Sequence, residues 1–384
     1  MGQLRAEVAV AQLPKHGEEL CGDCVQVVQD SSTLVVLSDG LGSGVKAHIL
    51  SSMTCKMIST MLRGGLELDD VIDSLSKTLP VCEVRHLAYS TFSILRIMPD
   101  NSAYLAEFDN PAVFLGRGSE LLPLRPESRE YGGKIVKESR FTLEDGDWLV
   151  MISDGILHAG IGGVWNLGWG WDRVGDYLRR LSPYEEDAES LARELVETTR
   201  KLYAGKPGDD ATAVVVRLRV PRRLTVLAGP PRRKSDDARV VRSFMEGPGK
   251  KVVCGGTTSL MVGRELGRKV EVELGSLRDS APPTGRIEGI DLVTEGILTL
   301  TRALETIRDG IPPRHRLRYR TDGPGRLAHC LAEADEIRFI VGRAINPAHQ
   351  SPDLPSELAL KSKVVEDLAR VLRGHGKEVT VDTY

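Results

Sequence analysis

Aspartates beside glycines recur at four places in the first half of the chain, and this pattern could support metal-dependent chemistry. Asp23 lies in CGDC, Asp39 in SDGLGSG, Asp154 in SDG, and Asp209 and Asp210 lie in GDDAT. Each stands at one end of a strand-like run. Aspartate holds its carboxylate close to the backbone, and the adjacent glycine lets the chain turn sharply or lets a carbonyl approach an ion. The pattern predicts acidic groups at several strand ends.

Carboxylates gathered at one sheet edge would repel one another and raise each other's pKa. A divalent cation removes that penalty, and oxygen ligands favour magnesium, manganese or calcium over zinc. Two such ions would activate a water molecule and neutralise a phosphoryl group. A single Asp-Gly pair is most often only a turn. The combination of four, rather than any one of them, therefore predicts a metal site.

The elements that must position these acids are strands with a few helices between them. Strand-like runs, rich in β-branched and aromatic residues, cover 34–37, 91–97, 103–108, 148–152 and 213–218. Helical patterns cover Val45–Leu62 and Asp187–Leu202. In the first, a row at every fourth residue predicts one buried stripe: Val45, Ile49, Met53, Met57 and Met61. Strands with intervening helices predict an α+β layered architecture.

In order and context these segments resemble the metal-dependent PPM protein phosphatases, in the bacterial branch typified by the SpoIIE sporulation phosphatase. The matching pieces, over about residues 1–220, are CGDC, VVLSDGLGSGVKA, FDNPAVFLGRG, FTLEDGDWLVMISDGI and PGDDATAVVVRL. The resemblance implies an α+β four-layer α-β-β-α sandwich with two Mn²⁺ or Mg²⁺ ions at one edge of the paired sheets. It also implies a serine/threonine phosphatase of phosphorylated proteins in bacterial signalling.

The resemblance implies a role for each acid. Asp39 would bridge the two ions, and Gly40 would offer its backbone carbonyl to one of them. Asp154 and Asp209 would bind the other ion, and Asp23 would hold metal-bound water. Asp39, Asp154 and Asp209 are accordingly the expected catalytic set.

The resemblance is less direct about the role of Asp210 and about which residue binds the phosphate. Asp210 stands where relatives have Asp or Asn, so it joins the expected metal-site residues in a more structural role. No arginine clearly matches the phosphate-binding residue of the eukaryotic branch. Arg5 fits poorly, and Lys15 is the remaining candidate.

Other residues near these motifs have both a functional and a structural interpretation. Trp165, Trp169 and Trp171 form a glycine-spaced loop after the SDG motif, which could be a wall for a protein substrate or ordinary packing. His48 follows the Asp39 loop and is either near the site or a solvent-facing or capping residue. Cys21-Gly22-Asp23-Cys24 permits redox control of the site, whereas small buried cysteines are the default.

After the Pro- and Arg-rich stretch Pro221–Asp237 the chain alternates strand and helix patterns. We predict strands at 224–227, 251–254, 269–274, 336–341 and 378–381, and helices at 238–245, 258–266, 290–307 and 358–372. This alternation indicates a mostly parallel sheet. The predicted domains are a phosphatase domain at 1–220 and an α/β regulatory or ligand-binding domain at 221–384.

One segment of the second half could bind an anion. VCGGTTS runs from a strand through two glycines into a helix, and backbone amides at a helix start attract phosphate or carboxylate. The candidate anion-binding residues are Gly255, Gly256, Thr257, Thr258 and Ser259. The alternative is a simple helix N-cap. Asp291, Glu295 and the loop 282–286 are expected on the same side.

Composition narrows the remaining classes of function and location. The 384 residues carry 51 Lys and Arg against 54 Asp and Glu, a net charge of −3, which argues against a non-specific nucleic-acid binder. No apolar run is long enough to cross a membrane, and no signal peptide is visible, so we expect a cytoplasmic protein without a membrane partner. The second domain could take a small-molecule or protein partner, and a homodimer stays open.

Two other functions compete with the phosphatase. The first half could be a pseudo-phosphatase, a metal-stabilised module that binds phosphoproteins without hydrolysing them. In the third interpretation the C-terminal half is the active enzyme and the first half regulates it, but no nucleophile–base pair is visible there.

Overall fold

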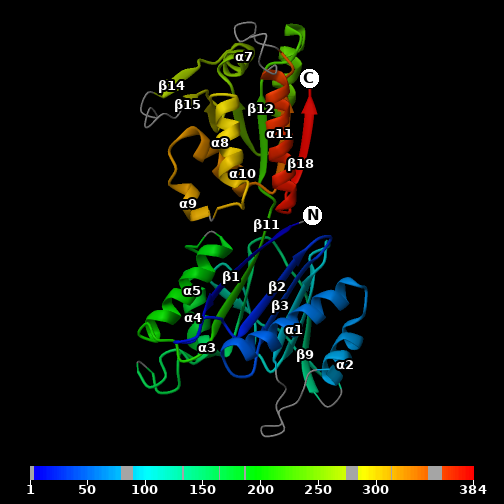
Figure 1. Ribbon diagram of the computed structural model, residues 1–384, viewed down its shortest axis with the longest axis vertical. Coiled ribbons are helices and arrows are strands. Elements are labelled where there is room, and N and C mark those ends of the chain that lie inside the picture. The colour runs from blue at the N-terminus through cyan, green and yellow to red at the C-terminus, as the bar shows by residue number, and fades with distance from the viewer. Residues whose placement is uncertain are drawn as a thin grey trace. The chain divides into compact units, whose positions relative to one another are not determined.

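The computed structural model describes residues 4–78, 90–131, 134–163, 165–185, 187–273, 284–312, 314–344 and 357–384. The chain divides into two compact units, Met1–Val220 and Pro221–Tyr384 (Figure 1). The division falls at the start of the Pro- and Arg-rich stretch, which itself contains the first strand of the second unit.

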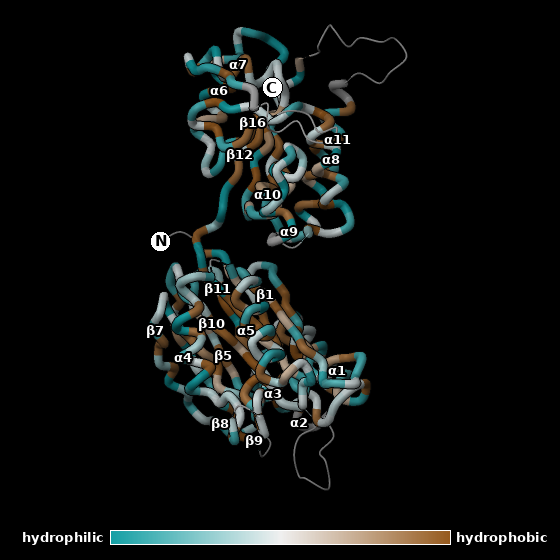
Figure 2. The backbone as a smooth tube through the Cα atoms, turned by 90° about the vertical axis from the view of Figure 1, so that its left-hand side faces the viewer, coloured by the Kyte–Doolittle hydropathy of each residue, from teal (hydrophilic) through white to brown (hydrophobic). Residues whose placement is uncertain are grey.

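Two antiparallel sheets form the centre of the first unit. One has the order β1 (Arg5–Leu13), β11 (Ala211–Arg219), β10 (Asp147–Ile152), β6 (Phe114–Arg117) and β7 (Glu120–Leu122). The other has the order β2 (Asp23–Gln29), β3 (Thr33–Asp39), β4 (Phe92–Ile97), β5 (Ser102–Phe108), β9 (Lys134–Thr142) and β8 (Glu127–Tyr131). Their facing sides share one core of buried aliphatic side chains, which appears as the hydrophobic strands inside this unit in Figure 2.

Helices cover both outer faces of this pair of sheets. α1 (Gly44–Arg63) and α2 (Leu68–Thr78) pack on the six-stranded sheet. α3 (Asp154–Leu157), α4 (Trp171–Leu181) and α5 (Ala188–Leu202) pack on the five-stranded sheet. Strand β3 shows why: Val35 and Leu37 point into the core between the sheets, and Leu34 and Val36 point toward α1. The predicted α-β-β-α sandwich is confirmed.

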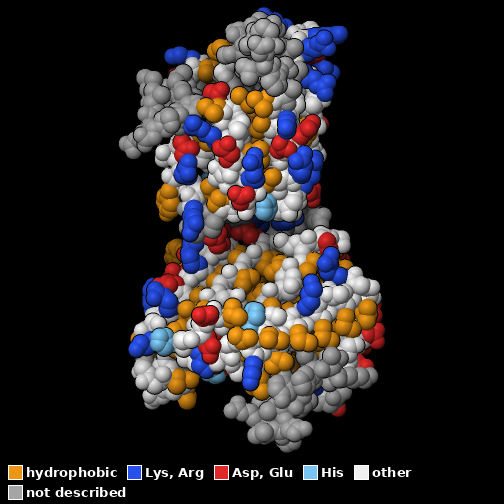
Figure 3. Space-filling model, in the orientation of Figure 1, with side chains coloured by type: hydrophobic (Ala, Val, Ile, Leu, Met, Phe, Trp, Pro, Cys, Tyr) orange, Lys and Arg blue, Asp and Glu red, His pale blue; other side chains and the backbone are white. Residues whose placement is uncertain are grey.

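The predicted buried stripe of α1 is wrong. Val45, Ile49 and Met53 are 60%, 51% and 50% exposed, and Figure 3 shows a row of hydrophobic side chains across this surface. The buried face includes Ser51, Cys55, Ile58 and Leu62, which alternate steps of four and three. An α-helix turns 100° per residue, so a row taken strictly every fourth residue drifts by about 40° at each step, and only its last members, Met57 and Met61, pack partly against the core.

The second unit is built on one mostly parallel sheet, as predicted. Its order is β14 (Glu271–Glu273), β15 (Thr284–Arg286), β16 (Leu292–Thr294), β13 (Lys250–Cys254), β12 (Arg223–Ala228), β17 (Glu336–Val341) and β18 (Glu378–Thr383). The last five are parallel, and β14 and β15 are antiparallel additions at one edge.

Helices cover both faces of this sheet. η1 (Lys234–Asp236) leads into α6 (Asp237–Glu246), and α6 and α7 (Gly256–Leu266) pack on one face. On the other side of the sheet lie α8 (Ile297–Ile307), α9 (Arg314–Arg318), α10 (Gly323–Glu333) and α11 (Glu357–Gly374). In the described part of the chain, no helix combines the length and the apolar character that a membrane crossing requires.

The long helix predicted at Ile290–Ile307 is also wrong. Leu292–Thr294 forms the buried strand β16, and α8 begins only at Ile297, after Gly296. The β-branched pair Val293 and Thr294 suits a strand between two others, and this tertiary pairing outweighs the helical periodicity of the longer segment.

Candidate metal centre

The predicted acidic residues come from both sheets of the first unit. Asp23 begins β2 and Asp39 ends β3, and the two face each other directly in the antiparallel register. Asp154 begins α3 immediately after β10, and Asp210 immediately precedes the adjacent strand β11. Because residues opposite each other in antiparallel strands have neighbouring side chains, the first pair is close by construction.

A hydrogen bond joins the two halves of the site across the sandwich. Ser153 Oγ donates to Asp23 Oδ2 at 2.7 Å and accepts from the Thr212 N–H at 2.9 Å. Asp23 is only 1% exposed, so this bond is screened from water. The end of β10, the start of β11 and the start of β2 therefore meet at one point.

The electrostatics show that the carboxylates lie close enough to repel one another. Burial raises the pKa of Asp39 to about 9, and the negative charges of Asp23, Asp154 and Asp209 add to this shift. Burial also raises the pKa of Asp23 to about 6, with contributions from Asp210 and Asp154. The pKa of Asp209 is raised by burial and by Asp154. Without a counter-charge, this cluster favours protonation of some members.

Two carboxylate oxygens of the cluster are buried without a partner. Within the described residues, Asp23 Oδ1 and Asp210 Oδ2 accept no hydrogen bond. The other oxygen of Asp210 accepts from the Lys15 N–H at 3.0 Å. A buried acceptor without a donor costs about 1–3 kcal/mol, so these oxygens indicate ligand positions.

Glycines let the backbone close around the acids. A Cβ on Gly40 would lie 2.1 Å from the Ala47 carbonyl oxygen, and a Cβ on Gly155 would lie 2.0 Å from the Asp210 carbonyl oxygen. Neither glycine has a positive φ. The Asp-Gly pairs at Asp39 and Asp154 are therefore explained by close packing of backbone on backbone, and a larger residue at either glycine would push the acids apart.

Lys15 and Arg5 lie at opposite ends of the first strand region. The positive charge of Lys15 opposes the pKa rise that burial imposes on Asp209, which places its side chain near the acids. Arg5 pairs with Arg219 at the far end of β1, whereas Leu13 pairs with Ala211 near the site. At about 3.3 Å per residue, Arg5 is too distant to contact a phosphate there.

Three residues that hold the CGDC segment were missed or left open by sequence reasoning. His48 Nδ1 lies 2.8 Å from the Cys21 carbonyl oxygen, and Ser51 Oγ donates to the Gly22 carbonyl at 2.6 Å. Gln12 Nε2 donates to the Asp23 carbonyl at 3.2 Å. His48 thus positions the loop that carries Asp23. No local sequence signal could reveal Ser51 or Gln12, because their partners are distant backbone atoms.

Cys21 and Cys24 are both free thiols with different surroundings. Cys21 Sγ lies 3.8 Å from Thr212 Oγ1, and burial raises its pKa to about 12. Cys24 packs beneath α1, where a hydrogen bond from Cys55 lowers its pKa to about 6.

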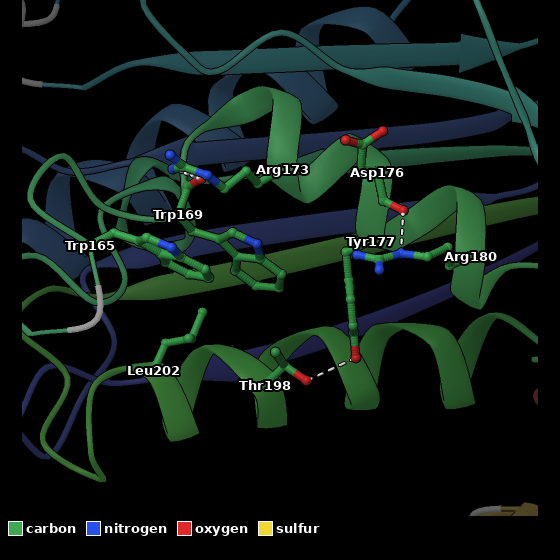
Figure 4. Close-up of a pocket in the computed structure, with 8 residues that line it drawn as sticks. All are labelled: Trp165, Trp169, Arg173, Asp176, Tyr177, Arg180, Thr198 and Leu202. Carbon is green, nitrogen blue, oxygen red and sulfur yellow. Dashed lines mark hydrogen bonds between the residues drawn. The ribbon is translucent and has the colours of Figure 1, made fainter.

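The tryptophan loop is mainly packed structure. Trp169 is buried edge-to-face against Tyr177, with ring centroids 5.2 Å apart, and Trp171 stacks on Phe114 at 4.5 Å. Trp165 and Trp169 also line a pocket of about 230 Å³, together with Leu202 and other residues of α4 and α5 (Figure 4). The packing interpretation holds for Trp169 and Trp171.

The acidic cluster suits divalent cations in its chemistry. In the described part of the chain, no three His, Cys, Asp or Glu side chains converge on one point as a closed metal shell would. The donors are nevertheless those that Mg²⁺ and Mn²⁺ prefer, since they are carboxylate oxygens, two of them buried without a donor. Burial and mutual repulsion raise the pKa values of Asp39 and Asp23. A bound cation would offset both effects.

This architecture, two stacked sheets with outer helices and aspartates at strand ends, is matched by a known family. The sequence profile described as Stage II sporulation protein E (SpoIIE) matches residues 29–219. Residues 29–219 therefore form a SpoIIE-like domain of the PPM phosphatase family.

Two curated relatives agree with this assignment. The chain is 27% identical over 223 residues to Stage II sporulation protein E of Bacillus subtilis, which covers 56% of this chain and 26% of that protein. It is 25% identical over 222 residues to the Priestia megaterium protein of the same name, covering 55% and 36%. The match thus spans about a quarter to a third of these relatives' length.

Among solved structures, the chain is similar to the PP2C phosphatase domain and regulatory-domain fragment of the cell fate determinant SpoIIE from Bacillus subtilis. The identity is 24% and the TM-score 0.49, over 57% of this chain and 63% of that one.

Proposed function

We propose that residues 1–220 are a metal-dependent protein-serine/threonine phosphatase that hydrolyses phosphoserine and phosphothreonine in a phosphorylated protein. The observation that carries this proposal is the meeting of strand-end aspartates from two sheets, joined by the Ser153–Asp23 hydrogen bond. The SpoIIE-like domain at 29–219 supports the same reaction class.

We assign cation binding to Asp39, Asp154 and Asp209, with Asp23, Asp210 and the Gly40 carbonyl completing the set. Two Mn²⁺ or Mg²⁺ ions would supply activation of the attacking water and neutralisation of charge on the phosphoryl group. Binding of the substrate phosphate falls to Lys15, the basic residue whose charge reaches Asp209.

Other residues of the chain hold these groups in place. Ser153 fixes one oxygen of Asp23, which leaves the other free for a ligand. Tyr203 Oη donates to the Gly155 carbonyl at 2.7 Å and so anchors the turn that carries Asp154. His48 and Ser51 tie α1 to the loop before Asp23. The acids are thus oriented before any ligand arrives.

The test is release of phosphate from a phosphoserine peptide by the purified full chain with added Mn²⁺. We expect metal-dependent turnover in the native chain and a loss of about a thousandfold or more in Asp39→Ala and Asp154→Ala, because the ions contribute several kcal/mol to the transition state. Asp70→Asn is the matched control, since Asp70 is an exposed aspartate in the first turn of α2.

The outcomes separate hydrolysis from binding alone. Full activity in Asp39→Ala would refute the assignment of the site. Binding of the phosphopeptide by the native chain, with no phosphate release at any Mn²⁺ concentration, would instead identify a binding-only module. The intact acidic set favours hydrolysis.

A further inference from the structure

A cavity of about 750 Å³ lies at one edge of the sheet in the second unit. It is lined by residues that follow the carboxyl ends of four parallel strands: Gly229 after β12, Gly255 after β13, Glu295 after β16 and Ala344 after β17. Counted in chain order, the parallel strands run 3-2-1-4-5 across the sheet. From the adjacent strands β12 and β17 the chain continues to opposite sides, to β13 and to β18. In such sheets ligands bind in the crevice at the carboxyl ends of the strands where this change of direction occurs.

One wall of the cavity is the start of α7, where the segment forms a helix N-cap at a glycine. In the described chain no side chain caps α7, and its N-cap residue is Gly255, with φ of +119°. The Thr258 hydroxyl accepts from the Gly229 N–H at 3.1 Å, and the Ser259 hydroxyl donates to the Gly256 carbonyl at 2.7 Å. The hydroxyls of Thr258 and Ser259 are thus engaged within the protein, and Gly256 and Thr257, whose amides belong to the first turn of the helix, line the cavity.

The charge of the lining favours an anion. Four basic and two acidic side chains contribute, namely Arg232, Lys234, Arg264, Lys361, Asp237 and Glu295. Arg264 and Asp237 pair with each other at 2.5 Å. A Cβ on Gly229 would lie 2.1 Å from Lys361 Nζ, so this ammonium lies directly against the glycine backbone. Arg232, Lys234 and the start of α7 therefore contribute positive charge to the same cavity.

Glu295 is a further polar group of the lining, and it follows Thr294, whose carbonyl accepts from the Gly255 N–H at 2.9 Å. Its Oε2 is buried and, among the described residues, accepts no hydrogen bond. A hydroxyl or amino group of a ligand would satisfy it. Leu260, Met261 and Ile297 add apolar surface to the lining. Asp291, expected on this side, lies at the opposite sheet edge, where it accepts from the Lys251 N–H at 2.7 Å.

We propose that the second unit binds a phosphorylated small molecule of nucleotide size in this cavity. Its phosphate lies at the start of α7 among Arg232, Lys234 and Lys361, and its hydroxyl or amino group reaches Glu295. The volume falls within the range of roughly 300–1,000 Å³ that is usual for small-molecule sites. The inference is independent of the phosphatase proposal, because it uses only residues of the second unit.

The test is isothermal titration calorimetry of the full chain with ADP, GDP, NAD⁺ and inorganic phosphate. We expect at least one of the three nucleotides to bind at least tenfold more tightly than inorganic phosphate. Binding of inorganic phosphate alone, or no binding of any nucleotide up to millimolar concentration, would overturn the proposal.

Gly256→Asp tests the position of the phosphate. A Cβ at Gly256 meets no atom within 4 Å, and an acidic residue at a helix start does not disturb the helix. We expect this variant to unfold at the same temperature as the native chain or higher, yet to bind the nucleotide at least thirtyfold more weakly. Unchanged affinity in Gly256→Asp would overturn the proposal.

A matched pair separates local from overall charge. Arg232→Glu and Arg242→Glu make the same change at exposed arginines, but only Arg232 lines the cavity. We expect at least tenfold weaker binding in Arg232→Glu and no more than a twofold change in Arg242→Glu. Glu295→Gln should weaken binding of the nucleotide and leave binding of inorganic phosphate unchanged. Equal losses in the two arginine variants would overturn the assignment.

Discussion

The candidate sites of the two units consist of groups with opposite charge. In the first, side-chain carboxylates from two antiparallel sheets are pressed together and repel one another. In the second, backbone amides at a helix start combine with basic side chains at the edge of a parallel sheet. The charges of the first candidate site suit a cation, whereas those of the second suit an anion. A glycine is central to each, for different reasons.

The largest expected effect on stability comes from adding one methyl group at Gly40, the glycine of the first site. In Gly40→Ala the new Cβ meets the Ala47 carbonyl oxygen at 2.1 Å, and backbone cannot yield as a side chain can. We expect the first unit to lose about 3 kcal/mol or more of unfolding free energy, measured by urea unfolding. All four tryptophans lie in the first unit, so their fluorescence reports on it alone.

Gly256→Ala is the matched control, because nothing lies within 4 Å of its Cβ position. We expect unfolding of the second unit, followed by circular dichroism, to be unchanged or more stable by up to about 1 kcal/mol. A tolerated Gly40→Ala would show that close packing does not shape the acidic site.

The pH dependence of stability should have opposite signs in the two units. In the first, burial raises the pKa of Asp23 from 3.8 to about 6 and that of Asp39 to about 9. Groups with raised pKa values bind protons more tightly when folded, so the metal-free unit should lose stability as pH rises from about 4 through these values. We expect a loss of about 2 kcal/mol or more between pH 5 and 8, measured by tryptophan fluorescence in urea with chelator present.

In the second unit, burial works against the charged form of Asp322, but hydrogen bonds from Arg320 and the Gly325 amide outweigh it and hold its pKa below 3.8. This contribution is present above the unfolded pKa and is lost as pH falls through the folded one. If the stability of the first unit does not change with pH when chelator is present, the close approach of the aspartates is contradicted. Added Mn²⁺ should reduce the slope.

The smallest expected effect concerns Lys15. Lys15→Met removes the positive charge near Asp209 but keeps the backbone N–H that holds Asp210. We expect KM for a phosphopeptide to rise about fivefold, equivalent to ~1 kcal/mol of an exposed charge interaction, with little change in kcat. An unchanged KM would leave phosphate binding to another residue. Arg5→Met is the control at the far end of β1.

Much of the fold could be predicted because its strands are continuous apolar runs. β3, β5, β10 and β11 were found to within three residues at each end, since each is bounded by Asp, Gly or Asn. The sequence pattern does not identify β1, β6, β7, β8 and β9, which are short or carry many polar residues. In α1 a row at every fourth residue begins on the exposed face, and at Leu292–Thr294 the pattern includes a three-residue strand in the helix that follows.

The acids of the candidate site could be identified, but their supports could not. Asp23 and Asp39 were visible as Asp beside Gly, whereas Gln12 and Ser51 act on carbonyls of the distant segment Gly22–Asp23. A hydrogen bond to a backbone carbonyl does not require a particular residue type in the partner, so it produces no recognisable sequence pattern. The cavity of the second unit was predicted only at Gly255–Thr258 and Glu295, because its other walls come from separate strand ends.

The pairing of β1 with β11 has a consequence for how this protein is made. The strand nearest the beginning of the first unit is completed only by the strand nearest its end, which is also the one that Asp209 and Asp210 precede. A ribosome must therefore deliver some 220 residues before the last acids can take their places. We expect chains that end before β11 to lack a complete acidic cluster, because the order of the strands brings its last members in at the end of the unit.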